Sequence, residues 1–65
     1  MKELARIQVE GQHDVVLFRV RRRFRVKYGA EVSDSVRRTD AATVFGMCVM
    51  HALECAGKLD GMGEK

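Results

Sequence analysis

Apolar and basic residues alternate along the segment Phe18–Tyr28, and this alternation is the strongest pattern in the chain. Ten of its eleven positions have a period of two, with apolar or aromatic residues at even positions and Arg or Lys at odd ones; the exception is Arg22. Successive side chains of an extended strand point to opposite faces, so the pattern predicts a strand with one apolar and one cationic face. Because the apolar phase is the same on both sides of Arg22, we predict one uninterrupted strand over residues 15–28, with Arg22 at the rim of the core.

Two shorter alternating segments flank this strand. Residues 4–10 alternate before the turn-forming cluster Gly11–Asp14, which predicts a first strand joined to the second by a hairpin loop. After Gly29, residues 30–37 alternate again and predict a third strand. Three consecutive strands with short connections form an antiparallel meander.

The periodicity becomes helical after Thr39. Residues 40–56 predict a helix, with Thr39 or Asp40 as its N-cap and Gly57 with Lys58 as its stop. The polar, glycine-containing residues 58–65 predict a frayed tail. The predicted fold class is therefore α+β: a three-stranded meander with one C-terminal helix on its apolar face (β-β-β-α), in a single small domain of residues 1–65.

The predicted helix is apolar around most of its circumference. One small sheet covers only one side of such a helix, and another copy of the chain would most simply cover a second side. A glycine inside a helix costs about 1 kcal/mol relative to alanine, which a close backbone approach at Gly46 would explain. We therefore predict a homodimer whose interface includes Phe45, Gly46, Val49 and Met50.

Residues 13–28 also have a helical interpretation. Leu17, Val20, Phe24 and Tyr28 fall on one face of a helix, although Val15, Phe18 and Val26 then lie off that face. A short strand followed by two helices resembles the ribbon-helix-helix DNA-binding family, and this resemblance implies that Arg6 and Gln8 read bases from a dimeric ribbon. The strand interpretation fits more positions, and ribbon-helix-helix remains the alternative fold.

Positive charge is concentrated in the middle of the chain. The 65 residues carry a formal net charge of +3, and half of the twelve Lys and Arg residues lie between Arg19 and Lys27. Alternate strand residues are roughly 6.5 to 7 Å apart, which is close to the spacing of successive phosphates, and each neutralised phosphate releases counterions. Arg37 and Arg38 precede the predicted helix, whose N-terminus also attracts anions. The predicted nucleic-acid-binding residues are Arg19, Arg21, Arg23, Arg25, Lys27, Arg37 and Arg38.

These features predict a non-enzymatic regulatory protein that binds DNA or RNA through a basic sheet face, as a homodimer. The alternative is a small interaction or inhibitor protein that binds an acidic surface of a partner protein. Within one chain, Cys48 and Cys55 are about 10 Å apart along the predicted helix and cannot share a metal ion with His51. We therefore predict no metal, no cofactor and no catalytic residues. With no apolar run near the ~18 residues of a membrane span and no signal-peptide pattern, we expect a cytoplasmic protein with reduced thiols and no membrane partner.

Overall fold

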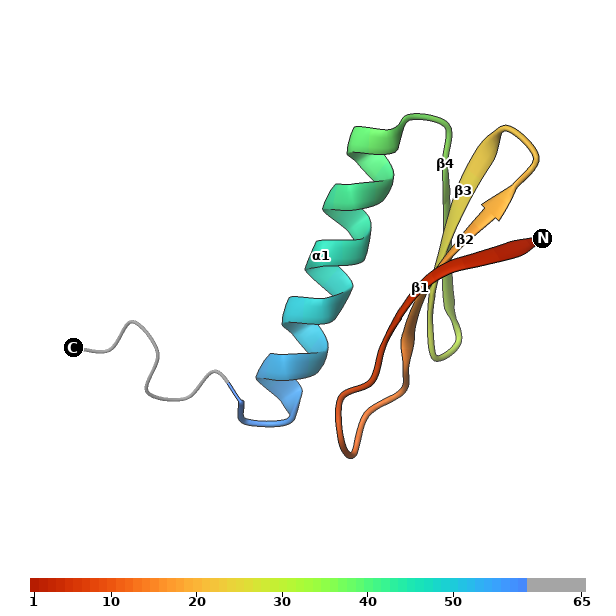
Figure 1. Cartoon of the computed structure of the whole chain (residues 1–65). Helices are drawn as coiled ribbons and strands as arrows, with labels where there is room; N and C mark the ends of the chain where they lie inside the picture. The colour runs from red at the N-terminus through yellow and green to blue at the C-terminus, as the bar shows by residue number, and fades with distance from the viewer. Residues whose placement is uncertain (59–65) are drawn as a thin grey trace.

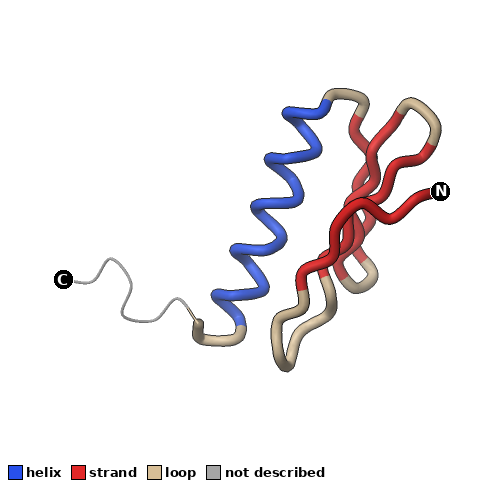
Figure 2. The backbone as a smooth tube through the Cα atoms, viewed as in Figure 1, coloured by secondary structure: helices blue, strands red, loops and turns tan. Residues whose placement is uncertain are grey.

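The computed structural model describes residues 1–58 and shows four strands followed by one helix (Figure 1). The elements are β1 (Lys2–Ile7), β2 (Val15–Val20), β3 (Arg23–Tyr28), β4 (Glu31–Ser35) and α1 (Arg38–Cys55). The strands form an antiparallel sheet in the order β1-β2-β3-β4, and α1 packs across one face of it (Figure 2). The predicted α+β class is confirmed, with four strands instead of three. The ribbon-helix-helix alternative is wrong, because residues 15–28 form strands.

A two-residue turn, Arg21 and Arg22, interrupts the segment that the sequence predicts as one strand. Val20 pairs with Arg23 beside the turn, and Val15 pairs with Tyr28 at the other end of the hairpin. Arg21 has a φ of 58°, and a positive φ at the first turn position alone matches a type II′ turn, whose twist suits a hairpin. Strands longer than about ten residues are uncommon. By folding back, the two halves of this segment satisfy each other's backbone hydrogen bonds.

The turn also changes which side chains share a face of the sheet. Residues that pair directly across an antiparallel ladder point to the same side, so the even-numbered residues of β2 lie beside the odd-numbered residues of β3. Phe18, for example, lies opposite Arg25. The expectation that the apolar side chains of residues 18–28 share one face is therefore wrong. The helix-facing set is Val15, Leu17, Arg19, Phe24, Val26 and Tyr28, and the opposite side, here called the open face, carries Val16, Phe18, Val20, Arg23, Arg25 and Lys27.

The core between sheet and helix is small and mostly aliphatic. Val15 and Val26 contribute the largest fully buried side chains, and Ala52 of α1 lies against them. Partly buried residues from both layers surround this centre, among them Leu17, Tyr28, Val44, Phe45, Cys48, Val49 and Leu53. The helix contacts mainly β2, β3 and β4, so β1 extends beyond the area that α1 covers.

The first and last strands are shorter or shifted relative to the predictions. β1 ends at Ile7 rather than continuing to residue 10, and its register against β2 shifts between Glu3 and Ala5. Val9 leaves the sheet, accepts a 2.9 Å hydrogen bond from the amide of Gln12 and is buried in the core. The predicted strand 30–37 is present as β4, which ends at Ser35.

The helix begins two residues before its predicted start at residue 40. Arg37 is the N-cap instead of Thr39 or Asp40, and its side chain makes no capping hydrogen bond. At the other end the amide of Gly57 donates to the carbonyl of Glu54, and the amide of Lys58 donates to that of Leu53. This Schellman arrangement uses the positive φ of Gly57 and confirms the predicted stop. Apart from Lys58, the predicted frayed tail lies outside the described residues.

Candidate nucleic-acid interface

The fold brings two basic segments that are distant in sequence to the same end of the molecule. Phe24 pairs with Ser35 at the last position of the β3–β4 ladder, so Arg23 and the β2–β3 turn lie beside the chain that leaves β4 for the helix. Figure 1 shows this turn and the start of α1 at the same end. Lys2 reaches that end because it pairs with Arg19. We call this surface the basic end, and its residues, all exposed, are Lys2, Arg19, Arg21, Arg22, Arg23, Arg37 and Arg38.

Positive charge at the basic end is not neutralised by neighbouring carboxylates. Within residues 1–58, the ion pairs engage Arg6 and Arg25 but none of the residues of the basic end. Asp40 follows Arg38 by two residues and lies in the first turn of α1, where the helix dipole favours an anion. Asp34, three residues before Arg37, is paired with Arg25 and is only weakly attracted by Arg23. The surface therefore has a strong local excess of cations.

Arg19 is held in place more firmly than a solvent-exposed arginine usually is. Its Nε donates a 3.0 Å hydrogen bond to the carbonyl of Arg21, and its guanidinium carbon lies 5.1 Å from the centroid of the Phe24 ring. A cation over an aromatic face is favoured by about 0.5 to 1 kcal/mol at an exposed site. The two contacts tie the Arg19 side chain to the base of the turn and leave part of its guanidinium available.

Arg25 has a different environment from the residues of the basic end. Its guanidinium makes a two-point contact with Asp34 across the β3–β4 pair, at 2.7 Å from Nε to Oδ1 and 3.2 Å from Nη2 to Oδ2. Hydrogen bonding from Arg25 lowers the pKa of Asp34 below its ordinary value, so this carboxylate stays ionised to a lower pH than an isolated aspartate does. Two of the nitrogen donors of Arg25 are therefore already used by Asp34 and are not free for a ligand.

The five basic residues predicted to form one row therefore lie in three places. Arg19 is on the helix side of the sheet and Arg21 is in the turn. Arg23, Arg25 and Lys27 are on the open face, with Arg23 at the basic end and Lys27 toward the opposite end. The structure brings Arg19, Arg21 and Arg23 together with Arg37 and Arg38, and separates Lys27 from them.

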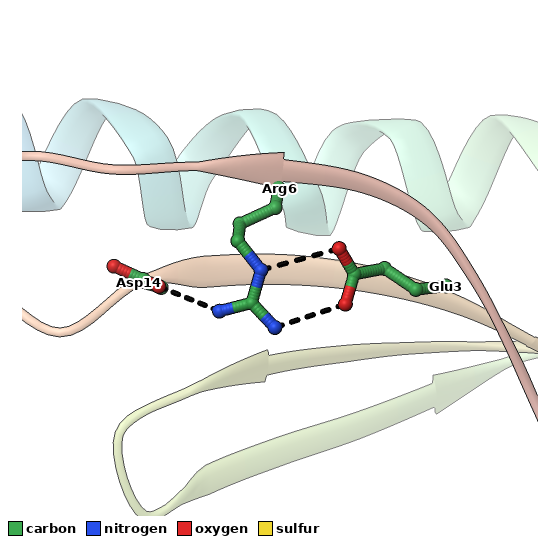
Figure 3. Close-up of polar contacts among 3 residues, drawn as sticks. All are labelled: Glu3, Arg6 and Asp14. Carbon is green, nitrogen blue, oxygen red and sulfur yellow. Dashed lines mark hydrogen bonds and ion pairs between the residues drawn. The ribbon is translucent and has the colours of Figure 1, made fainter.

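The open face is mixed in charge. Figure 3 shows the guanidinium of Arg6 between two carboxylates, at 2.9 Å from Glu3 and 2.6 Å from Asp14. Hydrogen bonding from Arg6 lowers the pKa of Glu3. An open hollow of about 350 Å³ lies next to this cluster, and its lining includes Val16, Phe18 and Lys27. With three carboxylates among its cations, this face is a weaker anion site than the basic end.

Sequence reasoning missed Arg22 as a functional candidate and placed Phe18 on the wrong face. Arg22 is the one residue that breaks the alternation, and that break marks the turn itself. Phe18, expected in the core, is on the open face opposite Arg25 and lines the hollow there. The length of the alternating segment was the available signal, since a 14-residue strand exceeds the usual range of about 3 to 10 residues.

Tyr28 and, on α1, His51 and the two cysteines contact other residues of the same chain. Tyr28 donates a 3.3 Å hydrogen bond to Gln12 Oε1, and its ring packs edge-on against the rings of His13 and His51. Cys55 Sγ lies 3.5 Å from His51 Nε2. Burial raises the pKa of the Cys48 thiol. Across residues 1–58, no three His, Cys, Asp or Glu side chains come together in a way that could hold a metal ion.

The residues predicted to form a dimer interface divide between two environments. Phe45 and Val49 pack partly buried against the core, whereas Gly46 and Met50 are exposed. A Cβ placed on Gly46 would have no atom within 4 Å other than its immediate helix surroundings. In the isolated chain, therefore, no close approach explains the glycine at this position.

Comparison of the chain with protein-family models, with curated proteins and with solved structures finds no match. Within residues 1–58, no helix combines the length and the apolar character that are needed to cross a bilayer. The fold and the site together define a small four-stranded α+β protein with an arginine-rich hairpin turn beside the start of its helix.

Proposed function

We propose that this protein is a non-enzymatic nucleic-acid-binding protein that contacts its ligand through the basic end. The observation that carries the proposal is the turn itself: three consecutive arginines, Arg21–Arg23, are exposed at the tip of a hairpin, and the first of them adopts a positive φ. An L-residue in this left-handed region costs about 1 to 2 kcal/mol. A turn selected for stability alone would use Gly, Asn or Asp here, so the arginine side chain itself is the feature that needs explaining.

The shape of the basic end suits a groove of a nucleic-acid duplex. A two-stranded β-ribbon fits the major groove of B-form DNA, which is about 12 Å wide. With the β2–β3 turn in the groove, Arg37 and Arg38 at the start of α1 would lie near the adjoining phosphate backbone. The first amides of α1 also lack a side-chain cap, and the positive end of the helix dipole favours an anion at this place.

The number of available arginines sets the expected salt dependence. The basic end has six arginines, and each phosphate contact to a duplex contributes about 0.9 to the slope of log affinity against log salt. If all six contact phosphates, a fourfold increase in salt concentration would weaken binding by about 10³-fold. Arginines whose planar donors contact phosphate oxygens at two points would add orientation to this charge effect.

Fluorescence anisotropy with labelled duplex DNA, duplex RNA and single strands, at 50 and 200 mM salt, tests the proposal. The variant Arg21→Ser/Arg22→Ser removes two charges from the turn and should weaken binding and reduce the salt slope by about 2. The matched control Lys27→Ser/Lys58→Ser removes two charges away from the basic end and should have a much smaller effect. Absence of binding to all three ligands at 50 mM salt would refute the proposal and favour an acidic protein partner.

A further inference from the structure

The outer edge of β4 is an exposed strand edge flanked by apolar side chains. β4 is the last strand of the sheet, so one side of its backbone has no neighbouring strand within residues 1–58. Three large apolar side chains near this edge are among the most exposed in the described chain: Val32 at 55%, Val36 at 65% and Met47 at 66%. Strand edges of this kind readily pair with a further strand.

A groove runs between this edge and the helix. It has a volume of about 450 Å³, Val26 and Tyr28 contribute to its lining from β3, and Val44, Met47 and Cys48 contribute from α1. Glu31, Val32 and Ser33 of β4 and His51 of α1 complete the lining. A strand added to the edge of β4 would place alternate side chains over this groove while its backbone pairs with β4.

We propose that a second copy of this chain pairs with the β4 edge, in an antiparallel register centred on Asp34. Val32 would then lie directly opposite Val36 of the second copy, and Glu31 opposite Arg37 of the second copy, each contact occurring twice. This interface is a property of the chain in addition to its proposed nucleic-acid binding, and it does not depend on that function, although it would engage Arg37 and leave five arginines of the basic end for phosphates.

The two-fold symmetry of a homodimer limits the possible registers. A two-fold axis perpendicular to the sheet keeps both helices on the same side. Residues that lie opposite each other must also share a face of the sheet. Both conditions are met only if the axis lies midway between two copies of the same residue. An axis at Ser33 would place Val32 opposite Asp34 and Glu31 opposite Ser35. An axis at Asp34 instead joins valine to valine and a carboxylate to a guanidinium, both favourable cross-strand pairs.

The proposed pairing requires a change in the backbone after β4. Arg37 has a φ of −90° and a ψ of 143°, which is extended geometry, but the chain bends at Val36 and Arg37 before α1 begins. Straightening of this short segment would let the strand continue from Ser35 to Arg37. Because successive residues of an extended strand point to opposite faces, Val32 and Val36 would then lie on one face and Ser33 and Ser35 on the other. Pairing through Arg37 would therefore cover all the exposed valines of this edge.

The central position of the proposed register places two Asp34 residues opposite each other. Like charges directly opposite are unfavourable, but each Asp34 already has a guanidinium, that of Arg25, at 2.7 Å. The four groups would form a row in which both carboxylates lie between guanidinium groups. The Arg25–Asp34 pair thus offsets the repulsion that this register would otherwise produce.

Cysteine cross-linking tests the register directly. In a background with Cys48→Ser and Cys55→Ser, residues on the two-fold axis should have Cβ atoms about 4.5 to 5.5 Å apart, close enough to form a disulfide with small adjustments. Asp34→Cys should therefore oxidise to a disulfide-linked dimer, whereas Ser33→Cys, which lies diagonally from its own copy, should form no disulfide cross-link under the same conditions. Efficient cross-linking of Ser33→Cys but not Asp34→Cys would overturn the register.

Sedimentation equilibrium of the full chain, with charge-swapped variants, tests the contacts. Glu31→Arg and Arg37→Glu should each weaken dimerisation at least tenfold, and the double variant should restore it because the attraction is re-formed with reversed sign. Val36→Lys should abolish the dimer, whereas Met50→Lys, on the outer surface of α1, should not change it. A chain that is monomeric at all concentrations, or a dimer lost only in Met50→Lys, would overturn the proposal. Thermal unfolding of each variant establishes that it is folded.

Discussion

Replacing Arg21 by glycine should make the protein more stable and weaken its binding to nucleic acid. Arg21 has a φ of 58°, and it is the one non-glycine residue with a positive φ within residues 1–58. Glycine adopts this backbone conformation without a steric penalty, and it is the usual residue at the first position of a type II′ turn. The same substitution removes one of the three arginines at the tip of the hairpin.

Two opposing effects set the size of the expected gain in stability. Releasing the left-handed strain of an L-residue is worth about 1 to 2 kcal/mol. The greater conformational freedom of glycine in the unfolded chain offsets about 0.5 to 1 kcal/mol of this. The net increase in the free energy of unfolding is about 0.5 to 1 kcal/mol, which for a chain of this size corresponds to a rise in Tm of about 2 to 8 °C.

The neighbouring residue provides a matched control for this prediction. Arg22 is in the same turn and carries the same charge, but its φ is not positive. Arg22→Gly should therefore lose about 0.5 to 1 kcal/mol of stability while weakening nucleic-acid binding to a similar extent as Arg21→Gly. Urea unfolding followed by circular dichroism, together with anisotropy titrations, measures both properties. Equal destabilisation by the two glycine variants would refute the strain argument, and unchanged binding in both would refute the role of the turn.

Three further substitutions or conditions test other parts of the structure. Gly46→Ala should raise the free energy of unfolding by about 1 kcal/mol in urea titrations, because the added methyl group meets open space; weaker self-association instead would show that the outer surface of α1 is a dimer contact. Gly29→Ala should lower stability by at least about 1 to 2 kcal/mol, since φ is +61° and the new Cβ would lie 2.8 Å from His13 Cδ2; adding His13→Ala should recover only the steric part. Because arginine hydrogen bonds lower the folded pKa of Glu3 and Asp34, their stabilising effect should be fully present above about pH 4 and lost as the pH falls through the lowered values. A Tm that does not change between pH 7 and pH 2 would contradict this.

The fold class was predictable because hydrophobic periodicity distinguishes strands from helices. A period of two before Gly29 and a helical pattern after Thr39 are enough to predict an antiparallel meander followed by a helix. The number of strands was not predictable in the same way, because Arg21 and Arg22 lack the turn chemistry of Gly, Asn or Asp. One non-alternating residue in a segment too long for an ordinary strand was the remaining local sign of the turn.

The candidate site was predictable only in its residue types. The concentration of arginine is visible in the sequence, but which arginines lie together depends on the topology. Arg37 and Arg38 join the β2–β3 turn because β4 returns to the end of the sheet where β3 begins. The pairing of Arg25 with Asp34 likewise depends on the register between β3 and β4, which a pattern of single residues does not specify.

The position of the basic end also determines how the molecule would approach its ligand. The opposite end carries Glu10, Glu31 and Glu54, on the β1–β2 loop, the start of β4 and the last turn of α1. Lys27 and Lys58 offset only part of this negative charge. In the antiparallel dimer proposed through β4 the dipoles of the two copies would cancel along the strands, but in a single chain the opposite charges at the two ends would give an electric dipole along the sheet. In the field of a polyanion such a dipole turns the molecule so that the hairpin arrives first, which increases the fraction of collisions that are productive. The association rate constant would therefore depend on orientation during diffusion, as well as on contacts made after arrival, and would fall as added salt screens the field.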